Sequence, residues 1–363
     1  MIAFYCFYLL LLFNSIYIFF FVITSFIYKP YSCNCNAKKH SFVFLIPAYA
    51  EDNIIIDTIE NLLSVNYPSS SFKIILIADS FKSSTIDILK KYPIQIIEEE
   101  FCVSSKSKAL KSTLPFLSKA SFSIILDADN HVDSNFLNNL SSYLNKNCIY
   151  QLHRKAKNLD TNLAILDAIS EEVNNCIFRA GHSAVGLSSA LIGSGIVIHN
   201  SMINKFISNN NSLGGFDKEL ELQILKDLIK IQYLDSVVVY DEKVSRNDDF
   251  INQRSRWINA QFKYLIKGVR ILFDQKLFFN LNFIDKLMQF SLIPRIWLLP
   301  THLLFLLLFI LINNKVFISL SVIGLLITII AIFLAIPKQL VKLLNLKLLS
   351  SIVHVFFLSI IAL

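Results

Sequence analysis

Charged residues are scarce in this chain, and most of them lie in its middle. Of the 363 residues, 17% are charged and 54% are hydrophobic, whereas an average soluble protein is about 25% charged. This composition excludes a protein that is soluble throughout. It predicts one soluble domain flanked by membrane segments.

Glycine is also scarce, with eight residues in the whole chain. No G-x-G-x-x-G follows the first expected strand, and no G-x-x-x-x-G-K-[ST] occurs anywhere, which argues against a Rossmann dehydrogenase and a P-loop NTPase. Nor does an arginine-rich run or a nucleic-acid motif accompany the net charge of +7. We therefore expect no nucleic-acid partner, and attraction to anionic membrane lipids is a sufficient explanation of the charge.

The six cysteines contain no paired C-x-x-C, so they predict no zinc site. Cys33 and Cys35 form a C-x-C just after the first apolar run, a position compatible with lipidation. Disulfides are not expected in a cytosolic domain.

Long apolar runs occupy both ends of the chain. Residues 1–28 are almost free of charge and long enough to span a bilayer. A cleaved signal peptide fits less well, because the run is too long and lacks a basic start and a cleavage site. The segment 29–40 is basic, and by the positive-inside rule it predicts a cytosolic linker with the N-terminus outside.

The C-terminal region 294–363 predicts further transmembrane helices. The runs 294–312 and 316–336 are separated by a short polar turn, which indicates a helical hairpin. The last run, 349–363, is short for a span, so we expect partial insertion or a truncated helix. The segment 269–293 mixes apolar and charged residues and fits an interfacial amphipathic segment; an ordinary surface helix fits it equally well.

The middle, 41–268, alternates strand and helix patterns. The run 42–46 ends at Pro47 and suits a strand buried on both faces. Further strands are expected at 73–78, 94–97 and 123–126, with helices between them. This order predicts an α/β domain with a largely parallel sheet.

Acidic residues stand where these strands end. Asp79 ends the second strand, and Asp127 and Asp129 follow the fourth. Ligands of such sheets lie beyond the carboxyl ends of the strands. In extended chain Asp127 and Asp129 would point the same way. Two neighbouring carboxylates suit a hard cation such as Mg²⁺ or Mn²⁺ that also binds phosphates.

Four segments in order resemble the membrane-bound family-2 glycosyltransferases, the group of cellulose, chitin and hyaluronan synthases and ceramide glucosyltransferase. They are Ile46-Pro47-Ala48-Tyr49-Ala50-Glu51, Ile77-Ala78-Asp79-Ser80, Leu126-Asp127-Ala128-Asp129-Asn130 and Gln253-Arg254-Ser255-Arg256-Trp257. The resemblance covers about 40–270 and departs at Ala50, where the family has Asn. It implies a GT-A fold, a mostly parallel sheet with flanking helices, carrying transmembrane helices at both ends.

The resemblance also implies roles for single residues. A nucleotide-sugar, with a UDP-sugar favoured, would be bound by Pro47, Tyr49, Glu51, Asp79, Asp127 and Lys106, or by Lys108 in place of Lys106. Asp127 and Asp129 would hold Mg²⁺ or Mn²⁺. The acceptor, a lipid or a glycan, would lie near Gly193, Ser194, Gly195 and Trp257, with Gln253 and Arg256 beside the membrane and Arg256 near the pyrophosphate.

Such a transfer needs one carboxylate base for the acceptor hydroxyl and inverts the anomeric centre. The family base is the Asp of Thr-Glu-Asp, but this chain has Asp217-Lys218-Glu219. Alignment favours Glu219 as the base. If a helix already includes Asp217, however, Asp217 and Glu221 share a face and Glu219 points away, so Asp217 stays as the alternative.

Two other classes remain open. One is a membrane scaffold with a degenerate, non-catalytic transferase domain. The other is a transporter, which the few ionisable residues in the expected spans disfavour; Arg295 and His302 are the exceptions. Turnover of a nucleotide-sugar separates the enzyme from both.

Overall fold

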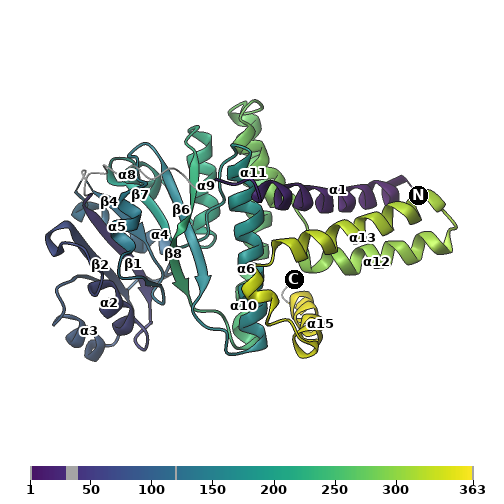
Figure 1. Cartoon of the computed structure of the whole chain (residues 1–363). Helices are drawn as coiled ribbons and strands as arrows, with labels where there is room; N and C mark the ends of the chain where they lie inside the picture. The colour runs from purple at the N-terminus through teal and green to yellow at the C-terminus, as the bar shows by residue number, and fades with distance from the viewer. Residues whose placement is uncertain (1, 30–39, 119–120, 362–363) are drawn as a thin grey trace.

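The computed structural model describes residues 2–29, 40–118 and 121–361. Most of the expected basic linker, with Cys33 and Cys35, lies outside these residues. Within them the chain forms a sheet domain and a bundle of apolar helices that extends from one side of it (Figure 1).

The sheet has eight strands in the order β3-β2-β1-β4-β7-β6-β8-β5. Neighbours pair in parallel from β3 to β4 and again between β6 and β8, while β7 and β5 run antiparallel to their neighbours. The expectation of a mostly parallel sheet is confirmed, and β4, β6 and β8 end at the same edge. The strands are β1 Phe42–Tyr49, β2 Phe72–Asp79, β3 Gln95–Glu99, β4 Phe122–Ile125, β5 His131–Val132, β6 Ile149–Ala156, β7 Ile196–His199 and β8 Ile231–Asp241.

Helices cover both faces of this sheet because its strands are apolar on both sides. In β1, Phe44 packs into a core with α2 and α5, while Leu45 packs into a second core with α4, α8 and α9. This is the two-layered burial expected of a central parallel strand. The helices of the sheet domain are α2 Ile55–Leu63, α3 Ser83–Leu89, α4 Lys106–Ser112, α5 Phe136–Ser141, α6 Asn162–Asn174, α7 His182–Ala184, α8 Asn200–Ser208 and α9 Phe216–Lys226. A π-helical stretch, Asn175–Gly181, joins α6 to α7.

The sequence placed the end of the first strand at Pro47, but β1 continues to Tyr49. Proline is tolerated there because β4 pairs with β1 only as far as Leu45. Beyond that point no strand on the β4 side needs the N–H that Pro47 lacks.

Among the described residues two helices, α1 Ile2–Ser25 and α13 Lys315–Ala335, are long and apolar enough to cross a membrane. A third candidate is the pair α11 Leu281–Ser291 and α12 Arg295–Leu311, which is bent by 63° at its break. Helices α12 and α13 form the expected hairpin and pack beside α1 (Figure 1). Two short C-terminal helices follow, α14 Lys338–Val341 and α15 Leu346–Ile361.

Between the sheet and the bundle runs the long helix α10 Asn247–Asp274 (Figure 1). It takes up the first part of the segment in which we expected an interfacial element. The later part, α11, buries Asp285 and Lys286 inside the protein. Most exposed apolar side chains of α10, α11 and the loop between them lie on α10 and in that loop, among them Phe262, Ile266, Phe273 and Phe279; on α11, Leu281 is also exposed.

Candidate functional site

The candidate site begins where β1 and β2 end. Tyr49 is exposed, whereas Asp79 beside it in the register is buried and accepts a hydrogen bond from Ser80 at 3.0 Å. The next residues, Ala50 and Ser80, adopt positive φ angles of 52° and 61°. Such backbone is costly for residues other than Gly, Asn and Asp, so the chain carries strain at this edge.

Asp127 and Asp129 lie in a turn and not in extended chain. The amide of Asn130 donates to the carbonyl of Asp127 at 3.2 Å, and the Asn130 side chain accepts from the Asp127 amide at 3.0 Å. The expectation that both carboxylates point the same way because of strand geometry is therefore wrong. They remain close enough for Asp127 to raise the pKa of Asp129.

Asp127 is the paired member of the two. Burial alone would raise its pKa, but the ammonium of Lys106, which forms an ion pair with it, Arg154 and a hydrogen bond from Ser194 lower the pKa overall. Lys106 is the first residue of α4, whose N-cap Ser105 accepts from the Lys108 amide at 3.3 Å. Lys108 itself turns to the carbonyl of Val103. The structure thus brings Lys106, and not Lys108, to Asp127.

Asp129 is the unbalanced member. Its burial, followed by the charges of Asp241 and Asp127, raises its pKa to about 7. No ion pair joins it to a cation in the part of the chain that the structure describes. Asn130 holds it in place by donating to Asp129 at 2.9 Å and to Asp241 at 3.1 Å. A further carboxyl group, Glu51, has a raised pKa through partial burial and the nearby Asp127 and Glu242.

A buried ionic cluster behind this turn was not found from the sequence. Arg154 on β6 binds Glu171 at 2.8 Å and Asp241 at 3.4 Å, and Lys243 binds Asp241 at 2.9 Å. Burial would raise the pKa of Glu171, but the charges of Arg154, Lys243 and Arg179 hold it well below its usual range. Asp241 carried a usable signal, since it ends an apolar strand as Asp79 and Asp127 follow theirs.

The loop before β7 closes the site on another side. Gly193 and Gly195 have φ angles of 42° and 65°. A Cβ on Gly195 would lie 3.3 Å from the side chain of Gln151, whereas none of the described atoms lies within 4 Å of one on Gly193. Between them, Ser194 contacts both Asp127 and Arg154. A side chain at Gly195 would therefore crowd Gln151, and Ser194 faces Asp127.

Helix α9 begins directly after Gly215, whose φ of 68° and close approach to Tyr264 leave no room for a side chain. The helix already includes Asp217. Glu219 is buried and accepts from Lys267 with both oxygens at 2.7 Å. Glu221 is also buried, and its Oε1 accepts from Lys286 of α11 at 2.7 Å. Asp217 is partly exposed, and its ion-pair partner is the adjacent Lys218 at 3.5 Å.

A hydrogen-bonded bridge brings the start of α9 towards the aspartate turn. Ser107, next to Lys106, donates to Asn210 at 2.7 Å. Asn210 in turn donates to the carbonyl of Phe216 at 3.2 Å. The two expected parts of the site, Asp127 and the first turn of α9, are thereby linked through α4.

Gln253, Arg256 and Trp257 all lie on α10, but no hydrogen bond or ion pair connects them to Asp127 or Asp129 within the described ranges. The side-chain oxygen of Gln253 is buried without a hydrogen-bond partner among the described residues. The anchored residue of the motif is Arg254, which binds Asp167 on α6 and stacks on Trp257 at 4.4 Å.

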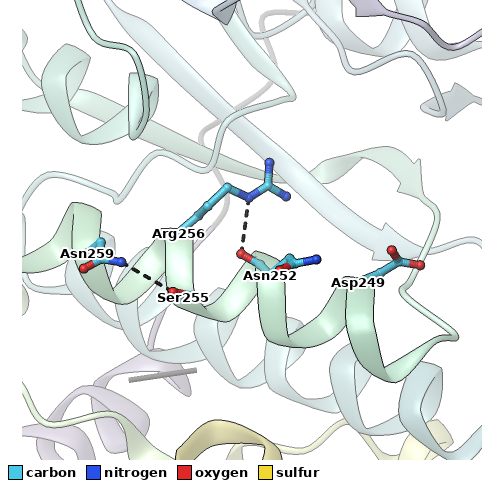
Figure 2. A pocket seen from close by; sticks show the side chains of 5 residues that line it. All are labelled: Asp249, Asn252, Ser255, Arg256 and Asn259. Atoms are coloured by element: carbon cyan, nitrogen blue, oxygen red, sulfur yellow. Dashed lines mark hydrogen bonds between the residues drawn. The ribbon is translucent and has the colours of Figure 1, made fainter. Parts of the chain in front are cut away.

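Arg256 projects from the exposed face of α10 into a shallow pocket of about 540 Å³ (Figure 2). Its Nε donates to the carbonyl of Asn252 at 3.4 Å. The pocket is lined by Asp249, Asn252, Ser255, Arg256 and Asn259. This surface is polar and suits a hydroxyl-rich or phosphorylated ligand.

The described residues contain no group of three His, Cys, Asp or Glu side chains placed to hold a metal unaided. The donors at the aspartate turn nevertheless fit a hard cation, because they are oxygens and Asp129 forms no ion pair among the described residues. Mg²⁺ and Mn²⁺ commonly use one or two carboxylates and complete their coordination with substrate phosphates and water.

The sheet order and its flanking helices define a fold of the GT-A type, and a solved structure shares this fold. A mannosyltransferase from Pyrobaculum calidifontis, PcManGT, in complex with GDP-Man and Mn²⁺, is 12% identical with a TM-score of 0.56, covering 89% of this chain and 93% of that one. TarS residues 1–349 of S. aureus is 13% identical with a TM-score of 0.44 and 88% of each chain covered. No curated protein sequence matches the chain.

The family model described as glycosyltransferase like family 2 matches residues 40–260, more than half of the chain. The chain belongs to this family and is a glycosyltransferase. The resemblance seen in the sequence motifs is confirmed at the level of the family.

Proposed function

We propose that the protein is an inverting, metal-dependent glycosyltransferase that moves a sugar from a nucleotide-sugar to a lipid-linked or polysaccharide acceptor at the cytosolic membrane face. The observation that carries the proposal is the unbalanced Asp129 beside Asp127 at the carboxyl edge of the sheet. A half-buried carboxylate that faces two other carboxylates is costly in the free protein. Its cost falls when a cation and a diphosphate arrive together.

In this proposal Asp127 and Asp129 hold Mg²⁺ or Mn²⁺, which stabilises the negative charge developing on the leaving diphosphate. Lys106 lies beside Asp127 and can turn from that carboxylate to a phosphate oxygen. Pro47, Tyr49, Glu51 and Asp79 form the edge against which the nucleoside would lie. Because Ser194 contacts Asp127, it keeps that carboxylate oriented.

The base comes from the first turn of α9. We favour Asp217 over Glu219 because Lys267 and Gln223 occupy the oxygens of Glu219. A carboxylate saturated with donors must break those contacts before it can accept a proton. Asp217 is freer, and the bridge through Ser107 and Asn210 relates its helix to the donor side.

The exposed face of α10 supports an amphiphilic acceptor. Its N-terminal half carries the polar pocket around Arg256. Its C-terminal half exposes Phe262, Ile266 and Phe273, spaced to share one face, with Lys263 and Arg270 beside them. A polar head at the pocket and an apolar tail along the stripe fit this change of character, as does a position in the membrane interface.

The test is release of nucleoside diphosphate from a panel of UDP- and GDP-sugars by the detergent-purified full chain, with Mn²⁺, Mg²⁺ or EDTA and with lipid extract as acceptor. We expect metal-dependent release from one donor. Asp129→Asn should lower it by about 10²–10³. Release that survives both EDTA and Asp129→Asn would refute metal dependence. No release from any donor would instead favour the scaffold.

The acceptor class is tested with the double variant Phe262→Ser/Ile266→Ser. A lipid acceptor predicts a raised KM for lipid extract, while donor hydrolysis without acceptor is unchanged. Leu228→Ser, an exposed leucine after α9, is the control for loss of surface apolar area. Equal effects of both changes, or a soluble glycan that serves as acceptor with either variant, would overturn the lipid assignment.

A further inference from the structure

A continuous chain of buried polar side chains runs from the membrane helix α1 into the sheet domain. Its members come from α1, α7, α11 and α9, and no more than 8% of any of them is exposed. They are Tyr17, His182, Asp285, Gln289, Lys286 and Glu221. We refer to these six residues as the polar chain. None of them is a donor-site residue of the proposed function.

At the membrane end the polar chain starts with Tyr17 of α1. Its hydroxyl donates to Oδ1 of Asp285 at 2.7 Å and lies 2.9 Å from Nε2 of His182. The His182 ring stacks on Phe21 with centroids 3.5 Å apart, and its Nδ1 lies 2.7 Å from the carbonyl of Ile177. Both sides of the imidazole are thereby fixed to α1 and to the π-helical stretch.

The polar chain then crosses α11 to α9. Gln289 donates to Asp285 at 2.8 Å and accepts from Lys286 at 2.7 Å. Lys286 donates to Oε1 of Glu221 at 2.7 Å. A buried ion pair of this kind adds little net stability, because desolvation of both charges offsets their attraction. What it does is fix the positions of the groups that it joins.

At the far end, Oε1 of Glu221 accepts the backbone N–H of Leu191 at 2.7 Å. Leu191 begins the segment 191–195, which we call the Ser194 loop. Gln151 accepts from the next amide, Ile192, at 2.9 Å and donates to the carbonyl of Ser194 at 3.0 Å. Since Ser194 contacts Asp127, a shift of Leu191 reaches the donor side through four residues of chain.

We propose that Glu221 and Lys286 are positioning residues that hold the Ser194 loop against Asp127, and that the polar chain relates this loop to the membrane helix α1. The catalytic consequence rests on the proposed function; the positioning of the loop does not. Neither residue touches the substrate in this assignment. They act through the N–H of Leu191.

The test uses the full chain in nanodiscs and two double variants. Glu221→Leu/Lys286→Met removes both charges of the ion pair together, and Asp285 keeps its contacts with Tyr17, His182 and Gln289, so the fold should be retained. Glu221→Gln/Lys286→Met is equally neutral but keeps an oxygen for the Leu191 N–H. We expect the leucine variant to raise the donor KM about tenfold, as loss of one ordering hydrogen bond would, and the glutamine variant to recover most of it.

Amide hydrogen exchange supplies a second readout that needs no turnover. The Ser194 loop should exchange faster in the leucine variant than in the glutamine variant, with the rest of the sheet unchanged. Tyr17→Phe, which cuts only the membrane end, should speed exchange less. These results would hold even if no donor were turned over, so failure of the proposed function is distinguishable from failure of this inference.

Asn280→Ala is the matched control. Asn280 also joins α11 to α9, since it caps α11 and donates to the carbonyl of Leu225 at 2.7 Å, but it does not reach the Ser194 loop. It should lower Tm without changing the donor KM or exchange in the loop. The inference is overturned if Asn280→Ala matches the leucine variant, or if the leucine and glutamine variants behave alike.

Discussion

Two groups of acids in this molecule, the buried acids of α9 and the half-buried acids of the aspartate turn, differ in how their charge is balanced. On α9 each buried acid has its own lysine: Glu219 binds Lys267 and Glu221 binds Lys286. At the aspartate turn Asp127 has Lys106, but Asp129 faces Asp241 and Asp127 without an ion-pair partner among the described residues. The α9 pairs are complete within the protein. The turn is not completed in this way, because no cation of the described residues forms an ion pair with Asp129.

This difference separates acids that order the structure from acids that await a ligand. A completed pair restricts the groups that it joins and offers no free charge to a substrate. A carboxylate without an ion-pair partner and with a raised pKa, such as Asp129, is typical of a functional site. The comparison therefore favours Asp129 as the carboxylate that meets a ligand. It makes Glu219 and Glu221 poor candidates for proton transfer.

The comparison fails most clearly if Glu219, whose two oxygens both accept from Lys267, turns out to be the base in place of the partly exposed Asp217. We expect Asp217→Asn to lower kcat by about 10²–10⁴, the usual contribution of a general base. Glu219→Gln should lower kcat less than about tenfold, because its loss perturbs only the contact with Lys267. Nucleotide release at saturating donor and acceptor measures both. The reverse order would restore Glu219 as the base.

The unbalanced charge of Asp129 predicts a pH effect on stability in EDTA. Its pKa is raised from 3.8 to about 7, so the folded state favours the protonated carboxyl. The contribution of the protonated Asp129 carboxyl to folding stability is complete below about pH 4 and is lost as the pH rises through 7. Metal-free Asp129→Asn should exceed the wild type at about pH 8 by up to about 4 kcal/mol and match it at about pH 4.

Thermal unfolding in EDTA at the two pH values checks this expectation. Asp79→Asn is a suitable companion variant, since Asp79 is a buried strand-end acid outside the aspartate turn. A stability gain for Asp79→Asn as large as that for Asp129→Asn would show that any buried acid of this edge behaves alike. The raised pKa would then not set Asp129 apart from other acids, and the contrast in charge balance between the turn and α9 would be refuted.

Much of this fold was predictable because local patterns carry it. Apolar runs such as Phe42–Ile46, followed by helix patterns, predicted the parallel strands, and Asp79 and Asp127 marked their carboxyl ends. Both candidate membrane regions followed from length and hydropathy alone. These features depend on residues that are close in the sequence, so the sequence pattern alone predicts them.

The balance of charge was not predictable, because it depends on contacts between distant segments. Arg154 and Glu171 read as isolated charges in a strand and a helix, and only the folded chain joins them to Asp241. The lysine that forms an ion pair with Glu219 is Lys267, which lies on α10 beyond the motif of residues 253–257. Even the turn at Asp127 needed the side chain of Asn130, which strand geometry does not reveal.

Lys267→Met tests the Glu219–Lys267 ion pair, the more exposed of the two α9 pairs. Glu219 would lose both charge-assisted hydrogen bonds, but the Lys267 side chain is 45% exposed, so water screens the loss. We expect a destabilisation of about 1–2 kcal/mol, measured as a lower Tm. Activity should change less than about twofold. A large rise in activity would mean that Lys267 restrains Glu219 as a base.

The smallest effect should come from an ion pair at the surface, Lys205 with Asp227 at 2.8 Å, where the lysine side chain is 60% exposed. Lys205→Gln should change stability by less than about 0.5 kcal/mol, because solvent already screens the attraction. The same Tm measurement gives the baseline for Lys267→Met. If Lys205→Gln were as costly as Lys267→Met, the fall in Tm would report lost surface charge, and the Glu219 pair could no longer be counted as a completed structural contact.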